Sequence, residues 1–199
     1  MMRRTILLVA TMALTLLAAS GVALAVNKIG TDGPDILRGT NGDDNLYGLG
    51  GNDILLALAG NDNLLGGPGK DIVNGGSLVE PFGGHKNLAG GDGNDAVQGG
   101  LGSDNLVGGD GNDFMVGGDD QHPGKDTLSG GAGSDVIWVI NRPAAKDLVS
   151  CGGGFDRVLA DRADVVALDC ERVFVGARNV DAFLESIPES FLEGLNPRF

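Results

Sequence analysis

A nine-residue unit rich in glycine and aspartate recurs through the middle of this chain. One copy runs from Gly39 to Tyr47, and the next follows directly from Gly48 to Leu56. Each copy joins a glycine-rich turn to an aspartate at the sixth position and an apolar residue at the eighth. Helical repeats need about 20–50 residues per unit, so a period this short is typical of a β-solenoid instead.

The period extends from about residue 30 to residue 140. Two units are longer, residues 75–89 and 117–129, and the apolar phase returns after each of them, so we expect the additions to form loops. The sixth-position aspartates are Asp35, Asp44, Asp53, Asp62, Asp71, Asp95, Asp104, Asp113, Asp126 and Asp135. The eighth-position apolar residues are Leu37, Leu46, Leu55, Leu64, Val73, Leu88, Val97, Leu106, Met115, Leu128 and Ile137.

Each part of the unit has a structural role. Glycines allow positive φ and close approach of neighbouring backbones, which a tight turn requires. The apolar residue and its two neighbours are too few for a helix but suit a three-residue strand with its middle side chain pointing inward. Two units make one coil, so unit n stacks on unit n+2. The sequence therefore predicts an all-β fold, a right-handed parallel β-roll.

The same turns carry oxygen donors. Calcium binds six to eight oxygens at about 2.3–2.6 Å in a flexible geometry, and carbonyls plus carboxylates from two adjacent turns can supply them. Because stacking brings such turns together, the sequence predicts calcium ions between units n and n+2. One ion for each intact pair of turns gives roughly five to eight ions.

These residues resemble the RTX nonapeptide calcium-binding repeats of secreted bacterial toxins, proteases and lipases. The resemblance covers residues 30–140 and continues in degenerate form to about residue 175. It implies a calcium-bound β-roll that stays unfolded in calcium-poor cytosol and folds outside the cell. Carried over by position, it implies side-chain ligands at the aspartates above. The implied carbonyl ligands are those of Gly30, Gly48, Gly66, Gly90 and Gly108.

One unit departs from the pattern because Lys86 stands at its sixth position. Stacking places Lys86 between Asp62 and Asp104. Its ammonium group then replaces one calcium ion in that row, or its side chain points to solvent from a degenerate loop. The sequence leaves both alternatives open.

Composition and charge narrow the function classes. The chain has 36 glycines in 199 residues and a net charge of −13, which disfavours nucleic-acid binding because phosphates would be repelled. No glutamate stands at a ligand position of the repeats. Divalent cations would relieve the repulsion among the aspartates.

The first 25 residues have the pattern of a cleaved signal peptide. Arg3 and Arg4 precede an apolar stretch, and Ala23-Leu24-Ala25 forms a small-x-small cleavage site. An uncleaved membrane anchor is the alternative, since the stretch is nearly long enough to span a bilayer. We expect a secreted, extracellular protein with no stable membrane span after cleavage. A leader of this kind departs from the better-known RTX proteins, so their export route does not transfer.

Beyond residue 140 the repeats become degenerate, and we expect a cap over residues 141–175. Two cysteines in an exported chain most simply pair, so the sequence predicts a Cys151–Cys170 disulfide that closes this cap. The tail, residues 176–199, either packs on the open end of the roll or stays mobile. We expect a short helix from Asp181 to Ser186 that Pro188 ends or kinks.

No catalytic motif is evident, and we expect no enzyme activity. The serines lack a G-x-S-x-G elbow, no H-E-x-x-H helix occurs, and His85 and His122 lie in the two inserted loops. A stand-alone exported calcium-binding β-roll is the favoured function. The alternatives are an accessory module of a toxin or hydrolase and an adhesive surface protein. Only the apolar residues Ile54 and Leu56 indicate a surface for an unknown partner.

Overall fold

The protein is a parallel β-solenoid in which each coil contributes one strand to each of two sheets. The computed structural model describes residues 24–76, 84–118, 124–141, 144–176 and 179–191. Within these residues, two eight-stranded sheets face each other, one of odd-numbered and one of even-numbered strands. The odd sheet contains β1 (Asn27–Ile29), β3 (Asn45–Tyr47), β5 (Asn63–Pro68), β7 (Asn87–Asp92), β9 (Asn105–Asp110), β11 (Thr127–Ala132), β13 (Leu148–Gly153) and β15 (Val165–Val166). The even sheet contains β2 (Ile36–Arg38), β4 (Ile54–Leu56), β6 (Ile72–Asn74), β8 (Ala96–Gly100), β10 (Phe114–Gly118), β12 (Val136–Trp138), β14 (Arg157–Ala160) and β16 (Arg172–Val175).

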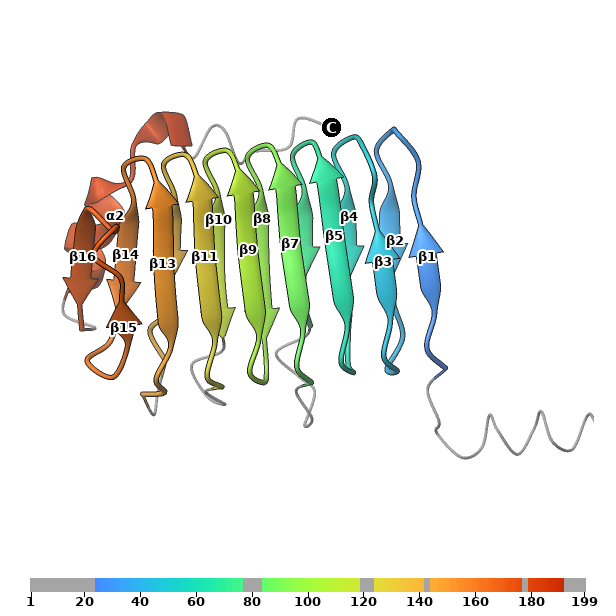
Figure 1. Cartoon of the computed structure of the whole chain (residues 1–199), viewed down its shortest axis with the longest axis horizontal. Helices are drawn as coiled ribbons and strands as arrows, with labels where there is room; N and C mark the ends of the chain where they lie inside the picture. Colours follow the sequence, from blue (N-terminus) through green and yellow to red (C-terminus); the bar gives the residue numbers. More distant parts are fainter. Residues whose placement is uncertain (1–23, 77–83, 119–123, 142–143, 177–178, 192–199) are drawn as a thin grey trace, which may run out of the picture.

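The register of the strands confirms that two nine-residue units make one coil. Leu46 pairs with Leu64 in the odd sheet, and Leu37 pairs with Leu55 in the even sheet, all in parallel. In Figure 1 the odd strands run upward on the near side and the even strands downward behind them, while the chain advances from right to left. The coil is therefore right-handed, as parallel crossover connections nearly always are.

The core lies between the two sheets and consists of the eighth-position side chains. Every one of the predicted core residues is buried, from Leu37 in β2 to Ile137 in β12. Val149 and Val158 extend the same ladder into β13 and β14. Since each strand points its eighth-position side chain inward, burial of these aliphatic side chains, about 1.5–3 kcal/mol each, fixes the register of every coil.

The two ends of the solenoid differ. All three residues of β1 are exposed, and β1 pairs only with β3 among the strands described. At the other end, the predicted disulfide is confirmed: Cys151 in β13 is bonded to Cys170, just before β16. The roll itself continues through the predicted cap as strands β13 to β16.

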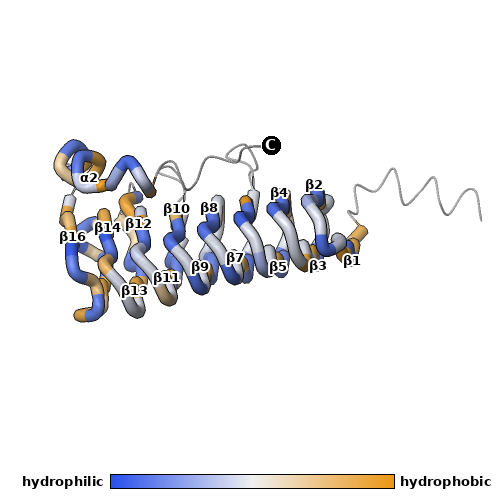
Figure 2. Tube along the Cα trace, turned by 90° about the horizontal axis from the view of Figure 1, so that it is seen from above, coloured by the Kyte–Doolittle hydropathy of each residue, from blue (hydrophilic) through white to orange (hydrophobic). Residues whose placement is uncertain are grey.

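The predicted helix is present as α2 (Val180–Ser186), but it does not cover the end of the roll. Figure 2 shows α2 beyond β12, β14 and β16, on the side away from the odd sheet. Phe183 is fully buried there and packs with Val136 and Leu159, and its ring meets those of Trp138 and Phe174 edge to face. A second, smaller core thus fixes the helix to the outer face of the even sheet.

The segment predicted to be a signal peptide lies almost wholly outside the described residues. No helix in the described part of the chain is long and apolar enough to cross a membrane.

Candidate metal centre: two rows of buried aspartates

The sixth-position aspartates form two rows that run along the solenoid, one on each edge. We call the carboxylates that precede the even strands the first row: Asp35, Asp53, Asp71, Asp95, Asp113 and Asp135. The second row precedes the odd strands and contains Asp44, Asp62, Asp104 and Asp126, with Lys86 between Asp62 and Asp104. All these aspartates are buried except Asp35, which is half-buried in the terminal coil.

One carboxylate oxygen of each aspartate after Asp35 is used to join neighbouring coils. Asp53 Oδ1 accepts the backbone N–H of Asp35 at 2.9 Å, and Asp71 Oδ1 accepts that of Asp53 at 2.8 Å. The second row repeats this contact, for example from the Asp104 N–H to Asp126 Oδ1 at 2.9 Å. The first row is therefore a continuous ladder of N–H donors and Oδ1 acceptors that holds successive turns in register, and the second row is the same ladder interrupted at Lys86.

The second carboxylate oxygen is buried without a hydrogen-bond partner in most coils. Among the described residues, this holds for Oδ2 of Asp53, Asp62, Asp71, Asp95, Asp104, Asp113, Asp126, Asp135 and Asp156. A buried polar atom without a partner costs about 1–3 kcal/mol, and more if it is charged. So regular a pattern of unpaired oxygens indicates a ligand that the polypeptide does not provide.

The first-position glycine of each unit borders the space next to this oxygen. A Cβ added to Gly90 would lie 2.7 Å from the carbonyl oxygen of Gly108 in the next coil and would collide with Asp95 Oδ2. The same pair of oxygens, a carboxylate from one coil and a carbonyl from the next, surrounds Gly30, Gly48, Gly66, Gly108 and Gly130. Glycine is thus required where the two donors converge.

These donors fit a calcium ion. The carbonyls of Gly48, Gly66, Gly90 and Gly108 lie beside the first row, as their assignment as ligands requires. Gly30 is the first of these glycines along the first row, and it lies beside Asp35 Oδ2 and the Gly48 carbonyl. Ca²⁺ prefers oxygen ligands, including negatively charged carboxylates, and accepts a flexible coordination geometry.

The electrostatics of the rows lead to the same interpretation. Burial raises the pKa of Asp113 to about 8 and the pKa values of Asp95 and Asp135 to about 7, and carboxylates of the same row add to the rise. Backbone N–H donors oppose the rise in each case. In the second row, burial raises the pKa of Asp126 to about 7. A nearby divalent cation would favour the ionised form of each group.

The first two units differ because threonine satisfies their carboxylates. Asp35 Oδ2 accepts hydrogen bonds from the N–H of Thr31 at 2.6 Å and from its hydroxyl at 2.8 Å. Asp44 Oδ2 accepts the N–H of Thr40 at 2.5 Å. Asp35 and Asp44 therefore already have polypeptide donors, and their assignment as metal ligands stays a prediction.

Lys86 occupies the aspartate position inside the second row. Its side chain is 2% exposed, so the interpretation that it points to solvent is wrong. Its backbone N–H donates to Asp104 Oδ1 at 3.0 Å, and its Nζ lies 3.3 Å from the carbonyl oxygen of Gly60. Burial raises the pKa of Asp62 and of Asp104 to about 6, and the charge of Lys86 partly offsets both rises.

Both rows continue beyond the residues predicted as ligands. Asp156 Oδ1 accepts the N–H of Asp135 at 2.8 Å, and Glu171 Oε2 accepts that of Asp156 at 2.9 Å. The second row extends through Asp147 to Asp164. The spacing from an acidic residue to the apolar residue two positions later marks Asp147, Asp156 and Asp164 in the sequence, and it also marks Glu171, where a glutamate replaces the aspartate.

A separate acidic cluster in the cap does not offer a metal site. Cys151, Asp169 and Cys170 lie close together, but the two sulfurs are joined in the disulfide. The Asp169 carboxylate accepts hydrogen bonds from Cys151 and Gly152 N–H groups and from the Ser150 hydroxyl. Its role is therefore to tie the last coils together.

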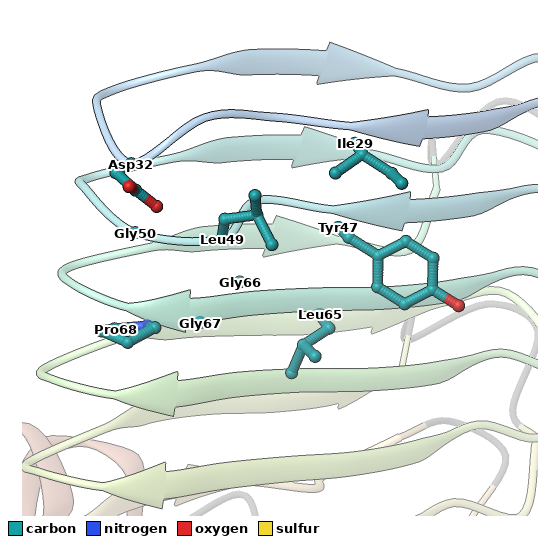
Figure 3. A pocket seen from close by; sticks show the side chains of 9 residues that line it. All are labelled: Ile29, Asp32, Tyr47, Leu49, Gly50, Leu65, Gly66, Gly67 and Pro68. Carbon is teal, nitrogen blue, oxygen red and sulfur yellow. The ribbon is translucent and has the colours of Figure 1, made fainter.

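A surface pocket lies on the odd sheet near the N-terminal end of the roll. It has a volume of about 440 Å³, and Figure 3 shows the side chains of Ile29, Tyr47, Leu49 and Leu65 around it. Ile54 and Leu56, which indicated a partner surface from sequence, lie on the even sheet instead and are half-buried. The pocket is open and mainly apolar, and it contains no convergent set of catalytic groups among the described residues.

Comparison with known proteins identifies the repeats. The family of RTX calcium-binding nonapeptide repeats matches four stretches of the chain, residues 29–64, 48–77, 89–121 and 123–138. Among curated proteins, none matches the chain significantly. The four matched stretches contain all ten sixth-position aspartates, from Asp35 to Asp135, and leave out residues 78–88, which include Lys86. The repeat region of this chain therefore belongs to the family of RTX calcium-binding nonapeptide repeats.

Proposed function

We propose that this chain is an exported calcium-binding protein whose β-roll folds when calcium binds between its stacked turns. The observation that carries the proposal is the series of buried Oδ2 atoms without a hydrogen-bond partner in the described coils. A bound divalent cation would supply the positive charge and the oxygen coordination that these atoms lack.

Different groups of the chain have different roles in such a site. The Oδ1 atoms and backbone N–H groups hold consecutive turns together, as in the contact from Asp95 N–H to Asp113 Oδ1 at 2.8 Å. The Oδ2 atoms of the aspartates, the sixth-position residues from Asp53 to Asp135, carry the negative charge that an ion would neutralise. The first-position glycines keep the space open, since any side chain there would meet both donors.

We expect folding to depend on calcium because, without bound ions, the buried carboxylates of the two rows destabilise the folded state. Burial of many like charges opposes folding, and the chain carries a net charge of −13. Binding of roughly five to eight ions to the folded state alone would stabilise it by mass action. The unfolded chain cannot bring turns n and n+2 together, so the binding free energy becomes folding free energy.

Export is supported by two independent features. The predicted leader, residues 1–25, precedes the first strand, and the disulfide is of a kind that persists in oxidising compartments. Extracellular calcium would then allow folding after export. Mass spectrometry of the secreted protein should give a chain that begins at Val26; a chain that retains Met1 would contradict the cleavage.

The alternatives, an accessory module and an adhesive protein, have less support. The exposed pocket is confined to the first coils of one sheet, whereas the aspartate rows extend along the whole solenoid. RTX β-rolls are calcium-binding structural domains and are typically not catalytic, which agrees with the proposed absence of enzyme activity.

Circular dichroism during a calcium titration tests the proposed function. At neutral pH we expect little β signal without calcium and a cooperative gain as calcium is added. Magnesium is the control, because its smaller ion demands near-ideal octahedral geometry and retains its waters. A calcium-free chain that is already β-rich and does not respond to calcium would exclude coupled folding.

A further inference from the structure

Two departures from the repeat lie in adjacent coils of the second row. Lys86 replaces the sixth-position aspartate, and Ala57 replaces the first-position glycine of the unit that carries Asp62. Strand β5 of the Asp62 unit pairs directly with strand β7, which follows Lys86, in a register that sets Asn63 beside Asn87. The two substitutions therefore alter the same space between two turns.

The Lys86 side chain fills the place that a carboxylate takes in other coils. In the Asp95 coil, the aspartate Oδ2 lies against the first-position glycine, Gly90. In the Lys86 coil, the corresponding glycine is Gly75, and a Cβ added there would lie 2.7 Å from Lys86 Cδ. The aliphatic stem thus follows the carboxylate's path, and the ammonium group continues to the Gly60 carbonyl in the turn before Asp62.

Ala57 narrows the same space from the other side. In the glycine coils, a first-position Cβ would meet the aspartate Oδ2 of its own coil and a carbonyl of the next. Ala57 stacks on the next coil in the usual register, since its N–H donates to the Asn74 carbonyl at 2.9 Å. Its methyl group therefore occupies a position that is empty in the units whose first residue is glycine.

We propose that the Lys86 ammonium group permanently replaces one divalent ion beside Asp62, and that the Ala57 methyl group closes the remaining space. This inference rests on the proposed function, calcium binding by the other coils. The buried lysine lies between the carboxylates of Asp62 and Asp104, and its amine supplies the positive charge that an ion supplies elsewhere. The second row is thereby divided at Lys86, and this one turn of the second row needs no calcium.

Counting bound ions tests the replacement. Native mass spectrometry at saturating calcium gives the number of ions on the wild-type chain, on A57G/K86D and on D71K. The double variant restores the repeat and should bind one more ion than wild type. The D71K variant places a lysine at the equivalent position of the first row, beside Gly66, and should bind one ion fewer.

The outcomes separate the two proposals. A wild-type chain without bound calcium would refute the proposed function. A wild-type chain that binds calcium, together with a folded A57G/K86D variant that gains no ion, would refute the role of Lys86 alone.

A second variant decides the question if the double variant does not fold. K86M keeps the length of the side chain but removes its charge, which leaves Asp62 and Asp104 without their cation. In saturating calcium its Tm should fall by roughly 6–20 °C, as for the loss of one partner of a buried ion pair. K125M, at an exposed lysine of the same roll, should leave Tm unchanged. Equal Tm values for K86M and K125M would overturn the proposal.

Discussion

At the residue scale, the two oxygens of each row aspartate have separate tasks. One oxygen of Asp113 accepts the N–H of Asp95 and aligns the coils, while the other is buried without a partner in the described structure. A neutral amide could still accept the structural hydrogen bond but could not supply the second, charged donor. The aspartates should therefore matter for calcium affinity more than for the shape of the turn.

Replacing Asp113 by asparagine tests this division. We expect D113N to require roughly tenfold more calcium for half-maximal folding, because affinity at such sites depends on the number of charged ligands. The control is D110N, at an exposed aspartate three residues earlier in the same coil. Circular dichroism during calcium titration gives both midpoints, and equal midpoints would contradict the assignment of Asp113 as a ligand.

The first-position glycines supply a second residue-scale prediction. G90A adds a methyl group 2.7 Å from the Gly108 carbonyl oxygen and against Asp95 Oδ2, and should destabilise the calcium-bound protein by about 1–3 kcal/mol. G153A is the matched control, because a Cβ at Gly153 would meet nothing within 4 Å. Thermal unfolding in calcium distinguishes them; a tolerated G90A would mean that the space between the two donors is not needed.

At the element scale, α2 lies outside the repeats and is held to the even sheet by packing. It packs on the even sheet through Phe183, whose neighbours come from β12, β14 and β16, and it contributes no residue to either aspartate row. Short helices have little intrinsic stability in water, so this contact must hold it. The helix should therefore affect the stability of the last coils without changing ion binding.

Truncating Phe183 tests whether this side chain holds α2 on the even sheet. F183A should cost about 3–5 kcal/mol of stability because it leaves a cavity in the smaller core, while the number of bound ions stays unchanged. L184A, one residue further on the same helix and 49% exposed, should have almost no effect. Urea unfolding of both variants decides the matter, and similar losses for the two would show that α2 is not held through Phe183.

The elements also show what a sequence pattern can and cannot predict. Period and apolar phase located the strands, the core ladder from Leu37 to Ile137 and the pairing of units n and n+2, because each depends on short-range repetition. The docking of α2 on a sheet face was not predictable, since it depends on which non-repetitive side chains meet in space. Glu171, which joins the first row, was missed because a glutamate stands there in place of the aspartate of the repeat.

At the scale of the whole molecule, the rows make stability depend on pH and calcium together. Burial raises the pKa values of Asp71, Asp95, Asp113 and Asp135 from 3.8 to between about 6 and about 8, so without calcium these groups bind protons more tightly in the folded state than in the unfolded chain. That contribution is present at acidic pH and is lost as pH rises through this range. Protons and calcium therefore compete for the same carboxylates.

This linkage gives a prediction for the calcium-free protein. It should be more β-rich at pH 5 than at pH 8, and calcium should raise the Tm by more at pH 8 than at pH 5. Circular dichroism with a chelator at both pH values, followed by thermal melts with and without calcium, measures both effects. A calcium-free fold that becomes more stable toward pH 8 would contradict the burial of unpaired carboxylates.

The central claim is that carboxylates and carbonyls from consecutive coils share divalent ions. Anomalous diffraction from crystals grown in calcium tests it most directly, because it locates each ion independently of the polypeptide. We predict peaks along both rows at about 2.3–2.6 Å from the aspartate Oδ2 atoms and the first-position glycine carbonyls, with no peak beside Lys86. Rows in which Oδ2 atoms face only water or polypeptide donors, without anomalous peaks, would contradict the account.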